Sequence, residues 1–182
     1  MNQPEKFNLK YLQPDVNISG WMSMDELVWL YGKAKKMESI VEVGCWMGRS
    51  THALLSGCHG TVYAVDHFKG SPSEIDGAHS AAKTEDIHAI FLNNLSGFTN
   101  LSVLKMDSLA ASKLFKEKEI DMVFLDPEHE YPDIKEIIET WLPKAKKLLC
   151  GHDVSQGGTP RAFEELNLSP KTEVGSLWSI KI

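Results

Sequence analysis

Short apolar runs alternate with amphipathic helical patterns along the chain from Ile40 onward. The runs predict strands, and their nearly continuous apolarity is typical of strands that are buried on both faces of a parallel sheet. The alternation therefore predicts an α/β fold in which helices cover both faces of a mostly parallel, doubly wound sheet. The predicted strands are Ser39–Val43, Thr61–Val65, Ile120–Leu125 and Lys147–Gly151, with Leu101–Leu104 as a weaker fifth.

Local signals place helices between these strands. Ser23 and Glu26 form a capping-box pattern ahead of an apolar helical face, and Pro132 suits the first position of a helix. The predicted helices are Met24–Met37, Thr84–Leu95, a helix that starts at Pro132 and ends or bends at Pro143, and Thr159 to Leu166. At the end of the chain, an antiparallel hairpin around Gly175 is predicted from Lys171–Val174 and Leu177–Ile182.

One long segment has no clear period. Residues His67–Lys83 are rich in Gly, Ser, Pro, Asp and Lys and follow a strand end directly, where α/β proteins place ligand-binding loops. We expect a mobile lid there, and another over Met1–Gly20. The whole chain, 1–182, is predicted to form a single domain, with an N-terminal helical and lid segment over 1–38 and the lid loop over 67–83.

Composition narrows the class of protein. A net charge of -6 argues against nucleic-acid binding, which normally needs a basic stripe. Cys45, Cys58 and Cys150 are odd in number and widely spaced, which favours reduced thiols in a cytoplasmic protein. No apolar run is long enough for a membrane span, and the N-terminus does not resemble a signal peptide, so no membrane partner is expected. The sequence leaves open whether the protein forms a homo-oligomer, because Trp178 suits a core or an interface.

A glycine-containing turn follows the first predicted strand, in Glu42-Val43-Gly44-Cys45-Trp46-Met47-Gly48-Arg49-Ser50. Glycines there either allow tight packing or let the backbone approach a ligand. Asp66 ends the next strand, where a carboxylate can accept both hydroxyls of an adenosine ribose, and this pairing favours a nucleoside. Cys45 and Trp46 would crowd a pyrophosphate, whereas Glu42 would attract the cationic groups of S-adenosylmethionine.

Three later strand ends carry polar residues. Asp107 and Ser108 either border an adenine or supply a helix cap at Ser108. Asp126 and His152-Asp153 end neighbouring predicted strands, where they could hold Mg²⁺ or a similar cation, although isolated acidic residues at loop starts are common. His129 could act as a general base or be an ordinary loop histidine.

At these residues the sequence resembles the class I S-adenosylmethionine-dependent methyltransferases, in the group of the macrocin O-methyltransferases and similar to the catechol O-methyltransferases. The resemblance runs from about Ser39 to Leu166. It rests on the segment Glu42 to Ser50, the strand end at Asp66, Lys69-Gly70-Ser71-Pro72, Phe91-Leu92-Asn93-Asn94-Leu95, Asp126-Pro127-Glu128-His129-Glu130-Tyr131 and Gly151-His152-Asp153.

The resemblance implies a seven-stranded Rossmann-like sheet of order 3-2-1-4-5-7-6 and metal ligation by Asp126 and Asp153, with His152 as a further candidate ligand. Catalytic roles are expected for Asp126 and His129. Pro127, Glu128 and Lys146-Lys147 depart from the family pattern. The predicted cofactor contacts are Glu42, Gly44, Cys45, Trp46, Gly48, Ser50, Asp66, His67, Asp107, Ser108 and Asp126.

These observations predict metal-assisted O-methylation of a small-molecule hydroxyl acceptor, such as a sugar or a phenol. A non-catalytic nucleoside-binding or assembly domain is the alternative, because the C-terminal elements are short and the family's Pro-Gly-Gly turn is absent. Cys45 and Trp46 disfavour a nicotinamide oxidoreductase. The expected acceptor lining is Trp21, Trp46, His67 and Phe68.

Overall fold

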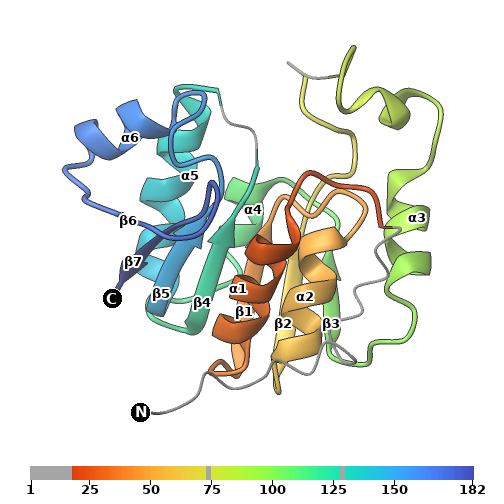
Figure 1. The fold of residues 1–182 in the computed structure, drawn as a ribbon, viewed down its shortest axis with the longest axis horizontal. Coiled ribbons are helices and arrows are strands. Elements are labelled where there is room, and N and C mark those ends of the chain that lie inside the picture. Colours follow the sequence, from red (N-terminus) through yellow and green to blue (C-terminus); the bar gives the residue numbers. More distant parts are fainter. Residues whose placement is uncertain (1–17, 73–74, 128–129) are drawn as a thin grey trace.

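Seven strands form one sheet in the order β3-β2-β1-β4-β5-β7-β6, which confirms the expected topology. The computed structural model describes residues 18–72, 75–127 and 130–182 (Figure 1). Strands β1 to β5 pair in parallel, whereas β7 runs antiparallel to both β5 and β6. The strands are β1 Ser39–Val43, β2 Thr61–Val65, β3 Leu101–Leu104, β4 Ile120–Leu125, β5 Ala145–Gly151, β6 Lys171–Thr172 and β7 Trp178–Lys181.

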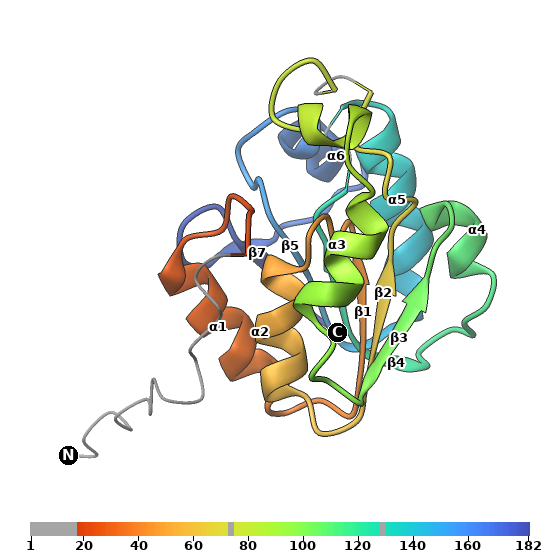
Figure 2. The ribbon, with the colours of Figure 1, turned by 90° about the vertical axis from the view of Figure 1, so that its right-hand side faces the viewer.

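Helices cover both faces of the sheet and bury a separate apolar cluster on each (Figures 1 and 2). The first cluster includes side chains of α1, α2 and α3, and the second includes side chains of α4, α5 and α6. The helices are α1 Met24–Ala34, α2 Arg49–Gly57, α3 Ile87–Asn94, α4 Ser108–Ser112, α5 Asp133–Trp141 and α6 Thr159–Glu165, with short 3₁₀ turns η1 Ser80–Lys83 and η2 Leu142–Lys144.

Side chains of β1 alternate between the two clusters, as the pleat of a strand requires. Ile40 belongs to the first cluster, and Val41 and Val43 belong to the second. Trp178, on β7, is 1% exposed and packs edge-to-face on Phe163 of α6. Of the two roles that the sequence left open for Trp178, the structure therefore selects the core.

Helix α1 ends at Ala34, three residues before the predicted end at Met37. The amides of Lys36 and Met37 donate to the carbonyls of Lys33 and Ala34, three residues back, instead of continuing the α-helical pattern. Such bonds tighten the last turn of a helix and satisfy its free carbonyls. The tight turn lets the buried Met37 side chain join the first cluster just before β1 begins.

Helix α3 begins at Ile87 rather than at Thr84, because the side chain of Asp86 caps it by accepting a hydrogen bond from the amide of Ala89 at 3.1 Å. Pro132 lies at the N-cap of α5 rather than at its first helical position, and Pro143 lies within the 3₁₀ turn η2 that follows α5. Strand β5 begins at Ala145, two residues before the predicted start at Lys147. The hairpin is confirmed as antiparallel, with shorter strands than expected.

Three further expectations concern the cysteines, membrane spans and the two lids. The three cysteines are buried and free. Within the described ranges, no helix combines the length and apolarity that a membrane span needs. The described part of the lid loop is irregular apart from η1, and its mobility stays a prediction. Most of the second predicted lid, residues 1–17, lies outside the described residues.

Candidate active site

Four strands end level with one another at the carboxyl edge of the sheet. The last residues of β2, β1, β4 and β5 are in register. The amides of Gly44, Asp126 and His152 each extend this ladder, donating at 2.8 to 3.0 Å to the last carbonyl of a neighbouring strand. The register therefore brings residues from distant parts of the sequence, Asp66 among them, to one edge.

A cavity of about 900 Å³ opens at this edge. It lies between the strand ends, the segment before α1 and the lid loop. Glu42 and Gly48 do not line it, and His129 lies outside the described residues. The predicted site residues that line the cavity are Gly44, Cys45, Trp46, Ser50, Asp66, His67, Asp107, Ser108, Asp126, His152 and Asp153.

Asp66 holds the glycine turn in place. Its Oδ2 accepts the amides of Cys45 at 2.8 Å and Trp46 at 2.9 Å, and its Oδ1 accepts the amide of Phe68 at 2.6 Å. The turn needs such support because Trp46, which has a Cβ, adopts a positive φ of 46°, whereas Gly44 takes φ 84° without strain. A Cβ on Gly44 would also overlap the backbone carbonyl of Asp126, so only glycine fits at this position.

Glu42 lies beneath this turn and is fully buried. Burial raises its pKa to about 7, and the hydroxyls of Ser50 and Thr51 beside it offset only part of the effect. Among the described residues, neither of its carboxylate oxygens has a hydrogen-bond partner of good geometry. The expected direct contact with the cationic groups of a cofactor therefore does not follow from this placement.

Gly48, which was also predicted to contact the cofactor, lies outside the cavity lining because it packs against α3. It adopts φ 96° as the N-cap of α2, and a Cβ there would press on side chains of Phe91 and Leu95. The first glycine of the motif therefore faces the cavity, whereas the second allows α2 to pack closely on α3.

Asp107 and Ser108 lie where the sequence placed them, but the cap expected at Ser108 is supplied by its neighbour, and the contact with an adenine stays a prediction. Both line the cavity. The cap of α4 is Asp107 rather than Ser108, because the Asp107 carboxylate accepts the amide of Ala110 at 2.9 Å. The Ser108 hydroxyl accepts a hydrogen bond from Nε1 of Trp141 at 3.3 Å.

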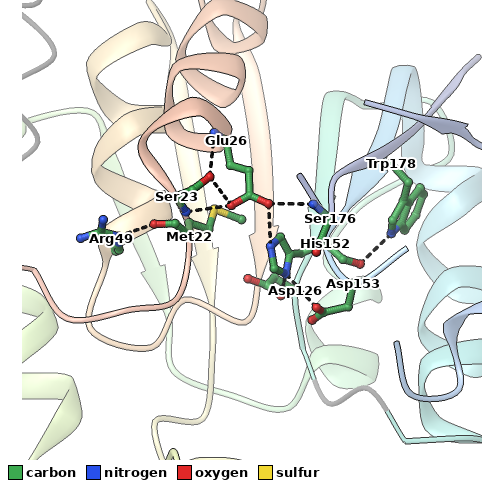
Figure 3. Close-up of polar contacts among 9 residues, drawn as sticks. All are labelled: Met22, Ser23, Glu26, Arg49, Asp126, His152, Asp153, Ser176 and Trp178. Atoms are coloured by element: carbon green, nitrogen blue, oxygen red, sulfur yellow. Dashed lines mark hydrogen bonds and ion pairs between the residues drawn. The ribbon is translucent and has the colours of Figure 1, made fainter. Parts of the chain in front are cut away.

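Asp126, His152 and Asp153 converge at one point of the cavity wall. One ligand atom from each lies within 4.8 Å of the others. Nδ1 of His152 is 3.1 Å from Oδ1 of Asp153 and 3.8 Å from Oδ1 of Asp126 (Figure 3). The two carboxylates suit Mg²⁺ or Mn²⁺, whereas an imidazole is more typical of softer divalent cations, so these residues fit a divalent cation without selecting Mg²⁺.

The carboxylates around His152 decide whether its ring is charged. Burial alone would lower its pKa, but the carboxylates of Asp153, Asp126 and Glu26 outweigh burial and raise the pKa to about 9. Without a metal ion, the ring is therefore protonated at neutral pH and donates from both nitrogens. A cation bound at Nδ1 would replace one proton, which is how metal binding to histidine releases protons.

Glu26 is a site residue that the sequence reading missed, because its capping-box pattern already explained it. Its Oε1 lies 3.1 Å from Nε2 of His152 and accepts the amide of Ser176 at 2.8 Å (Figure 3). Burial disfavours its charge, but the hydrogen bonds from Ser176 and Ser23 and the charge of His152 prevail, so the pKa of Glu26 is lowered. No sequence signal connects these distant segments.

Aromatic rings line the mouth of the cavity. The ring of His79 lies 4.5 Å from that of Trp46 and 5.0 Å from that of Trp21, which is 58% exposed. His79 was not foreseen in the acceptor lining. Phe68, which was foreseen, instead packs on Phe91 and is buried, so the prediction for Phe68 was wrong.

Arg49 attaches the segment before α1 to the start of α2. Its Nε donates to the carbonyl of Met22 at 2.9 Å, and its Nη1 donates to that of Ile18 at 3.0 Å. A Cβ on Gly20 would touch the Arg49 side chain. The wall that carries Trp21 is therefore attached to the helix that follows the glycine turn.

A family model described as a methyltransferase domain matches residues 41–154. The chain belongs to this methyltransferase family. The match spans the glycine turn, Asp66 and the cluster at the ends of β4 and β5, and it confirms the class expected from the resemblance. The search of curated proteins returned no match.

Solved structures with the same fold are distant in sequence. An O-methyltransferase from Bacillus cereus in complex with SAH (S-adenosylhomocysteine) is 20% identical, with a TM-score of 0.58 over 95% of this chain and 89% of that one. A SAH-bound methyltransferase from Podospora anserina is 13% identical, with a TM-score of 0.61 over 97% and 87%. A TDP-rhamnose 3'-O-methyltransferase of calicheamicin biosynthesis is 12% identical, with a TM-score of 0.60 over 99% and 88%.

Proposed function

We propose that this methyltransferase transfers the methyl group of S-adenosylmethionine to a hydroxyl group of a small molecule, with a divalent cation at Asp126, His152 and Asp153. One observation carries the proposal: the glycine turn with Asp66 and the Asp126–His152–Asp153 cluster line the same cavity. The B. cereus O-methyltransferase bound to SAH supports the choice of cofactor and of an oxygen acceptor.

The cofactor would lie across Gly44, with its ribose beside Asp66. Oδ2 of Asp66 already accepts two amides, whereas Oδ1 accepts that of Phe68. Since a carboxylate oxygen can accept about two hydrogen bonds, Oδ1 keeps capacity for one ribose hydroxyl. This role is narrower than the two-hydroxyl contact expected from the sequence. Asp107 and Ser108 would then border the adenine.

The carboxylates of Asp126 and Asp153 and Nδ1 of His152 would hold the cation. When bound, such a cation lowers the pKa of a hydroxyl coordinated to it. The cavity walls would align the acceptor oxygen with the methyl group and exclude water, which supplies most of the acceleration for an already activated donor. His129 stays the predicted base on the acceptor hydroxyl.

The charges of the cavity favour a neutral or cationic acceptor. Among the described residues that line the cavity, Arg49 is the one lysine or arginine. Its Nε and Nη1 already donate to backbone carbonyls. A phosphate-bearing acceptor, such as the nucleotide sugar of the TDP-rhamnose enzyme, would be repelled. A ring of the acceptor could stack on Trp21, Trp46 and His79. The lining carboxylates are those of Glu26, Asp66, Asp107, Asp126, Glu130, Asp133, Glu136 and Asp153.

Calorimetry with S-adenosylmethionine and SAH tests the foundation of this proposal. We expect saturable heat with both ligands and a rise in the melting temperature, because a ligand that binds the folded state stabilises it. Transfer of a labelled methyl group to a panel of uncharged hydroxylated compounds then tests the reaction. Absence of both heat and thermal shift would defeat the proposal, whereas binding without transfer would favour the non-catalytic alternative.

Replacing Asp126 with alanine separates the metal from the cofactor. We expect Mn²⁺ affinity to fall by about 100-fold, because a metal site needs its full ligand set, while SAH affinity changes little. Titration calorimetry measures both. Glu136→Ala is the matched control, since Glu136 lines the cavity outside the cluster. Equal Mn²⁺ affinity in wild type and Asp126→Ala would contradict the assignment.

A further inference from the structure

Helix α1 contributes one buried carboxylate to the site without belonging to the sheet edge that carries the other groups. Glu26 is 4% exposed, and its two oxygens have different partners. Oε2 accepts the Ser23 amide at 2.7 Å and the Ser23 hydroxyl accepts the Glu26 amide at 3.4 Å, which together form the ordinary capping box. Oε2 also accepts the Ser23 hydroxyl at 2.7 Å. Oε1 contributes nothing to capping, so its contacts call for another explanation.

Oε1 joins two distant segments of the chain. It accepts the Ser176 amide, which is 150 residues away, and lies 3.1 Å from Nε2 of His152, which is 126 residues away (Figure 3). Gly175 makes this approach possible, because it adopts φ 58° and a Cβ there would overlap Oε1. The loop before β7 is therefore shaped around this oxygen.

The backbone of His152 is fixed independently of its side chain. Its amide donates to the carbonyl of Leu125 at 3.0 Å, and its carbonyl accepts Nε1 of Trp178 at 2.9 Å. With the main chain fixed, the contact at Nε2 decides where Nδ1 points. Nδ1 faces Asp153 and Asp126, the other two members of the cluster.

We propose that Glu26 is a positioning residue, which accepts the Nε2–H of His152 and thereby directs Nδ1 to the point that Asp126 and Asp153 share. Histidine ligands of metal ions commonly donate their other ring N–H to a carboxylate, which fixes the tautomer and the ring orientation. The inference rests on the proposed cation site. It extends the reaction centre to a helix that precedes the matched part of the family, residues 41–154.

Mn²⁺ titration by calorimetry and electron paramagnetic resonance tests the inference on wild type, Glu26→Ala, Glu26→Gln and Ser23→Ala. Loss of such an outer carboxylate weakens metal binding by about 10- to 100-fold, and we expect this range for Glu26→Ala. Glu26→Gln should fall between wild type and alanine, because its amide oxygen can still accept Nε2–H. Ser23→Ala should keep wild-type metal affinity while losing about 1 kcal/mol of stability through the cap.

A second measurement does not depend on the metal. In the metal-free protein, the NMR signals and nuclear Overhauser contacts of the His152 ring should show the same ring orientation in wild type and in Ser23→Ala, and a changed orientation in Glu26→Ala. Circular dichroism and cooperative thermal unfolding of all four proteins show whether the fold is intact. If Glu26→Ala does not fold, the comparison of Glu26→Gln with Ser23→Ala decides.

The outcomes separate the two proposals. Wild-type Mn²⁺ affinity and unchanged ring signals in both Glu26 variants would overturn the positioning role and leave the cation site standing. Equal losses of metal affinity in Ser23→Ala and the Glu26 variants would reduce Glu26 to a helix cap, which also overturns the inference. No Mn²⁺ binding by wild type would defeat the cation site itself, and the inference with it.

Discussion

Asp66→Ala should weaken SAH binding by about 100-fold or more, because hydrogen bonds to a charged acceptor contribute about 1.5–3 kcal/mol each. The substitution leaves the amides of Cys45, Trp46 and Phe68 without their acceptor. The turn, in which Gly44 and Trp46 have positive φ, would then relax from the shape that lines the cavity. Titration calorimetry with SAH, at a temperature where the variant is folded by circular dichroism, measures the loss.

Asp86→Ala is the matched control for this substitution. Asp86, like Asp66, accepts a backbone amide, but this amide belongs to the first turn of α3 and Asp86 does not line the cavity. Its loss should cost about 1 kcal/mol of stability, as for other N-caps, and leave SAH affinity unchanged. An Asp66→Ala protein that binds SAH as wild type does would show that the turn keeps its shape without this carboxylate.

Glu42→Gln should stabilise the ligand-free protein by about 3 kcal/mol above pH 7 and have little effect below pH 4.5. The pKa of the Glu42 carboxyl is raised from 4.5 to about 7 in the folded state, so the folded protein binds the proton more tightly than the unfolded chain. Stability is therefore lost as pH rises from 4.5 through 7 and levels off above that. Urea unfolding of both proteins between pH 4 and pH 9 measures this difference.

Asp121→Asn provides a control of opposite sign. Asp121 is also buried, but Lys147 lies 2.8 Å from its Oδ2 and the amide of Glu38 donates to the same oxygen at 3.0 Å. Burial opposes its charge, yet these partners prevail and the pKa of Asp121 is lowered. Its substitution should therefore destabilise the protein at neutral pH. For Glu42, the contradicting outcome is the same pH dependence of the free energy of unfolding in wild type and Glu42→Gln, which would mean that Glu42 is solvated in solution.

The parts of the site that follow strand ends could be predicted from the sequence. Asp66, Asp126 and His152 each come directly after an apolar run, and parallel strands deliver such residues to one edge. Contacts across helices could not be predicted in this way. Glu26 read as a helix cap, and Phe68 read as a pocket residue, because the one-dimensional pattern does not say which face of a loop packs inward.

The sequence by itself determined the order and type of most elements, although α2 and α4 were not among the predicted helices. Apolar periodicity and capping residues act over a few neighbours, and the motifs indicated a nucleoside beside a glycine turn. Only the tertiary structure decided which side of that turn each side chain occupies. It buried Glu42 and turned Gly48 toward α3, and it brought Glu26 to His152 across 126 residues. Those placements depend on close packing between segments far apart in the chain, which local patterns do not encode.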